Sequence, residues 1–219
     1  MIEEIDVDGV TIWKGNYNFP NKGKVILKLL SIQKELEFAN VTEESGKAFS
    51  TVHYDKFRPH KSIYFSEFYK YLFGTVKHIH YGILNKNFVR PHKLTPVFKS
   101  GFSAFEYFQS AEEFTNSNLD ESIFNNKFLI DDSWCNLHYR TGETNLHEHG
   151  TATYVCSFYV NVPENSGNLL VKPKDTLIPV EVSTGDFIIF PGSLLHKTER
   201  SNSDEERVVA TTNIFAVDP

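Results

Sequence analysis

The sequence predicts an α+β fold in which an antiparallel jelly-roll core carries helices on one of its sheets. Two observations lead to this prediction. Apolar residues recur at helical spacing in the first half of the chain, whereas from about residue 132 they alternate with a period of two. Short alternating segments at even spacing, separated by turn residues, are typical of a sandwich or barrel. Helices gathered upstream of such strands would cover one sheet.

The N-terminal half contains the helical patterns. Residues 1–14 alternate weakly and predict a short strand or hairpin. Residues 23–38 and 66–84 each place an apolar stripe on one helical face, so both are predicted to be helices. Two shorter helices are expected at 103–115 and 119–128.

The C-terminal part contains the strand patterns. We expect strands at residues 133–140, 145–150, 153–162, 168–172, 178–182, 186–191, 195–199 and 207–216. Residues 131–219 would then form the β core, and residues 1–130 a mainly helical N-terminal extension that packs on it.

The composition excludes several classes of protein. The 22 Lys and Arg residues against 28 Asp and Glu give a net charge of −6, which argues against a nucleic-acid-binding protein. No apolar run approaches the ~20 residues of a membrane span, and the acidic start lacks the pattern of a signal peptide. Two cysteines do not make a disulfide framework, so we expect a reducing, cytoplasmic setting.

One predicted strand contains the sequence Leu-His-Glu-His-Gly. Side chains alternate along a strand, so His147 and His149 would share one face and Glu148 would point away. Two imidazoles on one face form a natural pair of metal ligands. His78 and His80 have the same spacing, but they fall in a predicted helix, where side chains two residues apart diverge by about 200°. We therefore interpret them as surface or helix-packing residues.

His196 is the third candidate ligand, on a late strand that a jelly roll returns beside the earlier ones. Three ligands with open coordination positions are typical of a catalytic non-haem iron site. Glu148 could replace His149 as a ligand only if a bulge shifted the strand by one residue.

Arg207 opens the last apolar strand. If it points inward, it is a buried cation that needs a carboxylate, which a bound dicarboxylate could supply. The other interpretation is a surface arginine paired with Glu205 or Glu206. A phenol often completes a carboxylate site, and Tyr159 and Tyr139 flank the histidine pair.

Residues 134–216 resemble the Fe(II)/2-oxoglutarate-dependent oxygenases, and most of all an oxygenase family common in marine bacteria and cyanophages. The residues that carry the resemblance, in order, are Trp134, Asn136, Gly142, His147, His149, Tyr159, Pro163, Gly167, Gly185, Asp186, Phe190, Pro191, His196, Arg207 and Asn213. The resemblance implies a double-stranded β-helix core, related to the cupins.

The resemblance also implies a set of ligands. Fe(II) would be held by the three candidate histidines, and the far carboxylate of 2-oxoglutarate would bind Arg207 and Tyr159. Tyr139, Asn136 and Asn213 would be further cofactor-binding residues. The activity implied is hydroxylation of a C–H bond with O2, with 2-oxoglutarate converted to succinate and CO2.

The substrate would be a protein side chain, with prolyl as one candidate, or a small molecule. The protein would be located in the cytoplasm, or in the cytoplasm of the host if the chain is phage-encoded. Assembly into a homodimer is an open alternative. The extension formed by residues 1–130 would supply a wall or lid of the site.

Two departures from the pattern of these oxygenases leave other functions open. Position 149 is usually a carboxylate in such oxygenases, and many relatives have Ser at position 209, where this chain has Val209. A cupin-type three-His metal dioxygenase that does not use 2-oxoglutarate fits His147, His149 and His196 nearly as well. A non-catalytic β-helix, with the N-terminal half binding a partner, is a third interpretation.

Overall fold

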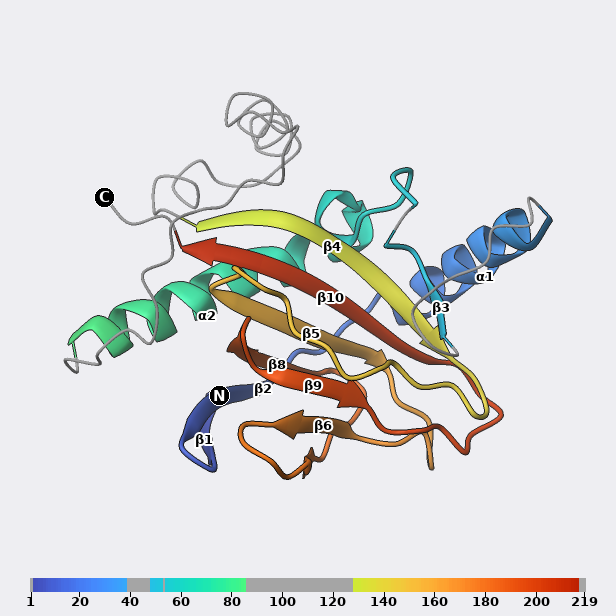
Figure 1. The fold of residues 1–219 in the computed structure, drawn as a ribbon. Coiled ribbons are helices and arrows are strands. Elements are labelled where there is room, and N and C mark those ends of the chain that lie inside the picture. Colours follow the sequence, from blue (N-terminus) through green and yellow to red (C-terminus); the bar gives the residue numbers. More distant parts are fainter. Residues whose placement is uncertain (1, 39–47, 53, 86–127, 217–219) are drawn as a thin grey trace.

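The structure is a computed structural model that describes residues 2–38, 48–52, 54–85 and 128–216 (Figure 1). In these ranges it shows two antiparallel β-sheets and two long helices. The described helices are not long and apolar enough to cross a membrane.

Seven strands form the larger sheet. In spatial order they are β1 (Ile2–Val7), β2 (Val10–Asn16), β8 (Asp186–Pro191), β5 (Tyr154–Asn161), β10 (Arg207–Ala216), β4 (Phe128–His138) and β3 (Ala48–Ser50). The smaller sheet has the order β7 (Ile178–Val180), β6 (Leu169–Lys172) and β9 (Leu195–Thr198). All strand pairs are antiparallel, as the jelly-roll prediction requires.

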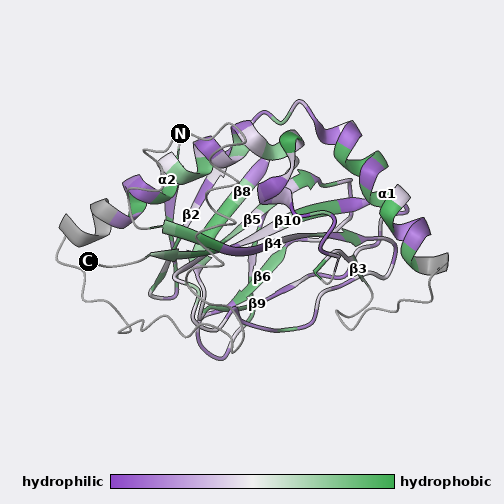
Figure 2. Ribbon diagram, turned by 90° about the horizontal axis from the view of Figure 1, so that it is seen from above, coloured by the Kyte–Doolittle hydropathy of each residue, from purple (hydrophilic) through white to green (hydrophobic). Residues whose placement is uncertain are grey.

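The two long helices cover one face of the larger sheet. They are α1 (Lys22–Phe38) and α2 (Ser66–Asn85), and the short 3₁₀ turns η1 (Pro59–Lys61) and η2 (Ile63–Phe65) lead into α2. Figure 2 shows both helices on one side of this sheet and β6 and β9 on the other. The helices expected at 23–38 and 66–84 are therefore confirmed.

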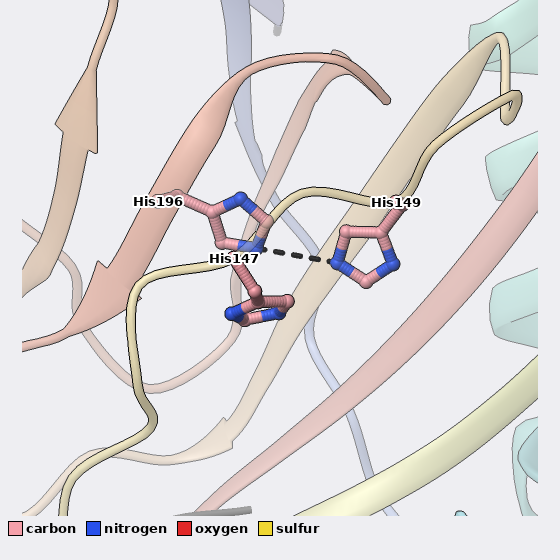
Figure 3. Close-up of side chains that lie close together, drawn as sticks. All are labelled: His147, His149 and His196. Atoms are coloured by element: carbon pink, nitrogen blue, oxygen red, sulfur yellow. Dashed lines mark hydrogen bonds between the residues drawn. The ribbon is translucent and has the colours of Figure 1, made fainter.

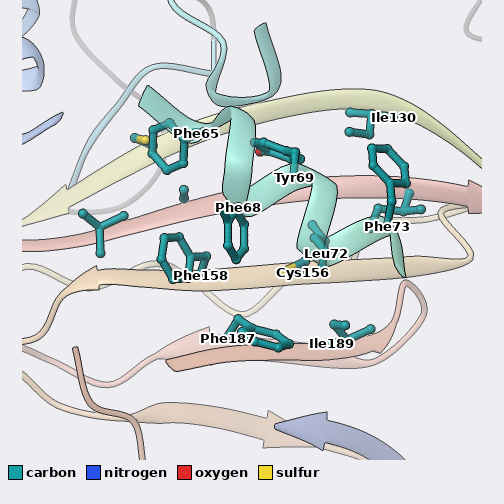
Figure 4. Packing of buried hydrophobic residues seen from close by; sticks show 14 of the residues in the cluster. Phe65, Phe68, Tyr69, Leu72, Phe73, Ile130, Cys156, Phe158, Phe187 and Ile189 are labelled. Atoms are coloured by element: carbon teal, nitrogen blue, oxygen red, sulfur yellow. The ribbon is translucent and has the colours of Figure 1, made fainter. Parts of the chain in front are cut away.

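Aromatic side chains fill the space between the helices and the sheet (Figure 4). The ring of Phe68 in α2 stacks on Phe158 in β5, with centroids 3.9 Å apart. The hydroxyl of Tyr69 forms a hydrogen bond of 2.7 Å with Thr212 in β10, so the buried phenol has a polar partner. Burial of these large rings removes apolar area from water and fixes α2 on the sheet.

Residues on the opposite face of the larger sheet pack against the smaller sheet. Alternate residues of β10 show the division, because Val208 and Ala210 join the helix-side cluster and Val209 joins the cluster between the sheets. Arg207 has the same parity as Val209, so it faces the space between the two sheets. The register of β10 with β4 places Arg207, Val209, Thr211 and Asn213 on this same face.

The N-terminal hairpin extends the larger sheet. β1 and β2 are joined at Asp8 and Gly9, which both have positive φ, and β2 pairs with β8. Positive φ at both central positions suits the twist of a two-residue hairpin. β4 begins at Phe128, before the expected start of the β core at residue 131. The division of the chain into residues 1–130 and 131–219 stays a prediction.

One expected strand is wrong. Residues 145–150 do not form a strand, and only His147 makes an isolated bridge, to His196. The segment turns at Gly150, which has a φ of 55°, and the amide of Ala152 donates to the carbonyl of His149. The other strands expected in the C-terminal part are confirmed; their ends shift by no more than two residues, except that β4 begins at Phe128 rather than at residue 133.

Two further expectations concern the helices predicted between residues 103 and 128 and the two cysteines. The helices expected at 103–115 and 119–128 lie outside the described residues, apart from Phe128, which begins β4. Cys135 and Cys156 are buried free thiols in the helix-side cluster, so they pack as small apolar residues.

Candidate metal centre

His147, His149 and His196 come together between the two sheets (Figure 3). One ring nitrogen from each lies within 4.8 Å of the others. His196 is the second residue of β9, and its backbone exchanges hydrogen bonds of 3.0 and 2.9 Å with that of His147. These bonds fix the two residues side by side although residues 145–150 form no regular strand.

Two of the three imidazoles are oriented by backbone carbonyls. Nδ1 of His147 lies 2.7 Å from the carbonyl oxygen of Asn145, and Nδ1 of His196 lies 2.8 Å from that of Leu194. A carbonyl oxygen only accepts, so the proton of each neutral ring is on Nδ1. The Nε2 lone pairs are then free to bind a metal, in the tautomer that metal-ligating histidines use.

His149 is held by ring stacking. Its imidazole is nearly parallel to that of His196, with centroids 5.0 Å apart and the two Nε2 atoms 3.2 Å apart. The indole of Trp134 in β4 also stacks on His149, at 5.6 Å. Glu148 is exposed to solvent and does not belong to the cluster of His147, His149 and His196.

The surroundings keep two of these rings neutral. Burial, with a smaller contribution from the nearby His147, lowers the pKa of His196 to about 3 and that of His149 to about 4. A neutral imidazole is the form that binds a metal, so the rings of His149 and His196 are both in the ligating form at neutral pH.

A buried arginine lies at the start of β10, on the face that carries Trp134. Arg207 is 1% exposed, and its guanidinium donates to the carbonyl of Ser166 at 3.2 Å and lies over the ring of Tyr159 at 5.5 Å. Burial lowers the pKa of Arg207, and Tyr159 and Glu199 oppose that change. Among the described residues, Arg207 has no carboxylate within ion-pair distance. The surface pairing with Glu205 or Glu206 is therefore wrong.

Several buried polar atoms on this face have no hydrogen-bond partner within the described ranges. They are Oδ1 of Asn136, Oδ1 of Asn213, Nδ1 of His138, Oγ of Ser166 and Nε of Arg207. Buried polar atoms are nearly always paired, so a cluster of unpaired ones indicates a face built to contact a polar ligand. A dicarboxylate fits the donors of this set, and three neutral imidazoles fit a divalent metal.

Most predicted site residues lie on this face, but Tyr139 does not join it. Its hydroxyl donates to Gln33 of α1 at 2.7 Å, and its ring packs on the helix-side cluster. His78 and His80, the second pair with this spacing, lie on the surface or pack against a neighbour as predicted. His78 is exposed, and His80 contacts the hydroxyl of Tyr154 at 3.0 Å.

Two residues of the site have no role that the sequence predicts. The motif contains Trp134 without giving it a function, and no sequence pattern points to His138. His138 lies directly opposite Arg207 in the β4–β10 register, a relation that strand parity alone does not give.

No protein-family model matches the chain, and no curated protein matches it. Solved structures that it resembles include a 2OG-Fe(II) oxygenase family oxidoreductase from Burkholderia pseudomallei, with a TM-score of 0.37, 12% identity, and coverage of 52% of this chain and 51% of that one. A Pseudomonas putida prolyl-4-hydroxylase has a TM-score of 0.34 and 12% identity, covering 87% and 100%. HygX from Streptomyces hygroscopicus, with nickel, 2-oxoglutarate and hygromycin B bound, has a TM-score of 0.33 and 11% identity, covering 54% and 81%.

The first of these structures carries the name of the oxygenase family that the sequence motifs resemble. The chain spans about half the length of the first of them. Because the TM-scores are below 0.5, the inference about function rests on the residues of the site rather than on these matches.

Proposed function

We propose that the chain is an Fe(II)- and 2-oxoglutarate-dependent dioxygenase that hydroxylates a C–H bond of its substrate. The observation that carries this proposal is the buried guanidinium of Arg207, which has no carboxylate partner in the described part of the chain. A metal site alone gives no reason for such a cation. A dicarboxylate cosubstrate between Arg207 and the three imidazoles accounts for both features.

We infer that the two sheets form a double-stranded β-helix. From β4 onward the chain alternates between the sheets in the order large, small, large, small, small, large, small, large, if the bridged segment at His147 counts as a strand of the smaller sheet. Each sheet then contributes four segments, and the space between them holds the candidate site. In such a β-helix the candidate site would lie inside the β core.

The residues present fit an iron centre. Nε2 of His147, His149 and His196 would hold Fe(II) and leave coordination positions open. Bound iron and 2-oxoglutarate would together supply the oxidising power, with one oxygen atom of O2 going to the substrate and the other to succinate as CO2 leaves.

The chain's own residues would hold the cosubstrate. Arg207 offers charge-assisted hydrogen bonds to the far carboxylate, and pairing would offset the cost of burying the guanidinium. Burial raises the pKa of Tyr159, so its phenol stays protonated and can act as a neutral donor beside Arg207. Asn136 and Asn213 line the same face with unpaired Oδ1 atoms. Tyr139 is left out of this set because it contacts Gln33.

The substrate class follows from the sequence resemblance: a protein side chain, with prolyl as one candidate, or a small molecule. A homodimer and a cytoplasmic location stay predictions.

One observation favours a second function. Histidine at position 149 leaves the metal with three neutral ligands, as in three-His dioxygenases that do not use 2-oxoglutarate. In that case Arg207 would have no role in cosubstrate binding.

The experiment that separates the two functions measures O2 uptake and succinate formation in the presence of Fe(II), with and without 2-oxoglutarate. We expect succinate from the wild-type protein and a loss of about 100-fold or more in kcat/KM for 2-oxoglutarate in Arg207→Met, because the charge-assisted contacts are removed. Arg200→Met is the matched control, since Arg200 is exposed. O2 uptake that needs iron but not 2-oxoglutarate would favour the three-His alternative.

A further inference from the structure

His138 is a buried histidine whose ring is paired on only one side. The residue is 1% exposed, and Nε2 lies 2.8 Å from the hydroxyl of Thr144. Nδ1 is buried and has no hydrogen-bond partner among the described residues. A buried ring nitrogen of this kind needs an explanation, and a bound ligand is one.

His138 and Arg207 are direct neighbours. They lie opposite each other in the antiparallel register of β4 and β10, so their side chains extend from the same face with Cβ atoms roughly 5 Å apart. Nε of Arg207 is a second buried atom without a partner. Unpaired nitrogens on two neighbouring residues of one face fit a single ligand that contacts both residues.

The chemistry of the pair selects an acceptor. Burial lowers the pKa of His138 to about 3, and the charge of Arg207 adds to that change, so the ring is neutral. When the Thr144 hydroxyl donates to Nε2, the ring proton is on Nδ1. Nδ1 of His138 and Nε of Arg207 are then two N–H donors on neighbouring residues of one face, and such donors suit a carboxylate.

We propose that Nδ1–H of His138 donates a hydrogen bond to the far carboxylate of 2-oxoglutarate, next to Arg207. This inference rests on the proposed function and adds to it a cosubstrate-binding residue with a defined tautomer. It also gives the Thr144 contact a role, because a hydroxyl that donates to Nε2 keeps the ring proton on Nδ1.

Two variants test the role of each ring nitrogen. The side-chain amide of Asn is attached to Cγ, as Nδ1 is, whereas that of Gln reaches the position of Nε2. His138→Asn therefore keeps a donor near Nδ1, and His138→Gln keeps only the contact with Thr144. The measurement is calorimetric titration of 2-oxoglutarate into protein saturated with Fe(II) under anaerobic conditions.

We expect His138→Gln to weaken 2-oxoglutarate binding by roughly tenfold to a hundredfold and His138→Asn by no more than about threefold, as for the loss or retention of a hydrogen bond to a charged group. Fe(II) affinity should be unchanged in both variants, because His138 is not one of the metal ligands. In ¹⁵N NMR spectra of the wild-type protein, the His138 Nδ1 signal should show a bound proton and shift when 2-oxoglutarate is added.

Three results would overturn the inference. They are wild-type affinity in His138→Gln, equal losses in the two variants, and a parallel loss of Fe(II) affinity that shows a general distortion. A wild-type protein that binds Fe(II) but not 2-oxoglutarate would instead overturn the proposed function itself. The wild-type titration therefore distinguishes the two failures.

Discussion

The imidazoles of His149 and His196 lie nearly parallel, at 10°, with their Nε2 atoms 3.2 Å apart. Because Nδ1 of His196 is committed to the carbonyl of Leu194, its Nε2 is an acceptor. A single proton from His149 can then bridge the two nitrogens. A divalent cation that binds both rings would replace that proton.

Removal of His196 should abolish this centre. We expect His196→Ala to weaken Fe(II) binding by more than about 100-fold, since changes to residues that only orient metal ligands already cost 10- to 100-fold. The measurement is anaerobic Fe(II) titration of the folded protein. His78→Ala is the control, because His78 is exposed on α2 and outside the cluster. Equal affinity in the two variants would contradict the assignment.

Glu148 should have no part in metal binding. Its side chain is exposed, and His149 occupies the place beside His196. We expect Glu148→Gln to change Fe(II) affinity by no more than about twofold, because solvent and salt screen an exposed charge. His149→Ala should instead show a large loss in the same titration. The reverse pattern would show that a bulge brings Glu148 to the metal.

The hydroxyl of Tyr159 should matter for the cosubstrate. We expect Tyr159→Phe to raise the Kd for 2-oxoglutarate by about 3- to 30-fold, the range for loss of one hydrogen bond near a charge. Tyr69→Phe is a matched control, because Tyr69 is equally buried but its hydroxyl contacts Thr212 on the helix side of the sheet. It should lower the free energy of unfolding without changing the Kd. An unchanged Kd in Tyr159→Phe would remove Tyr159 from the cosubstrate site.

His60 should make the protein less stable in acid. Burial lowers its pKa to about 3 from an ordinary value of 6.5, and Lys61 and Arg58 add to the change. The unfolded chain therefore binds a proton below pH 6.5 that the folded chain does not bind. The free energy of unfolding contributed by the neutral ring is fully present above pH 6.5 and is lost as the pH falls toward 3.

Between pH 7 and 5.5 the loss from this one group should be about 1 kcal/mol. The measurement is urea unfolding at both pH values, for the wild-type protein and for His60→Asn, whose amide can keep the contact of Nδ1 with Ser133. The variant should lose correspondingly less stability. Equal losses in the two proteins would show that His60 is protonated in the folded state.

The parts of the fold that the sequence predicted are those with a strong period. The helix-facing stripe of α2 and the alternation of β10 are both fixed by burial, so they can be recognised without a structure. The strand expected at 145–150 failed for a physical reason. Its alternation comes from two metal-type ligands rather than from a sheet face, and the positive φ of Gly150 turns the chain.

The candidate site was predictable where a motif carried it and not where strand register did. The grouping of His147, His149 and His196 follows from their spacing, whereas the sequence left Arg207 either inward or on the surface and the structure shows it buried. The parity of β4 could have excluded Tyr139, because residues 135 and 137 before it face the helices. The pairing of His138 with Arg207 depends on how two distant strands align, and no local pattern encodes that register.

The most direct test of the account is anaerobic titration of Fe(II) with and without 2-oxoglutarate, observed through the weak visible charge-transfer band that iron and cosubstrate give together. We expect a band that requires both components, disappears in His196→Ala and weakens in Arg207→Ala. Iron binding that never gives this band would contradict a role for 2-oxoglutarate and favour the three-His alternative. Failure of the wild-type protein to bind iron would leave the three histidines without a metal and contradict the central claim.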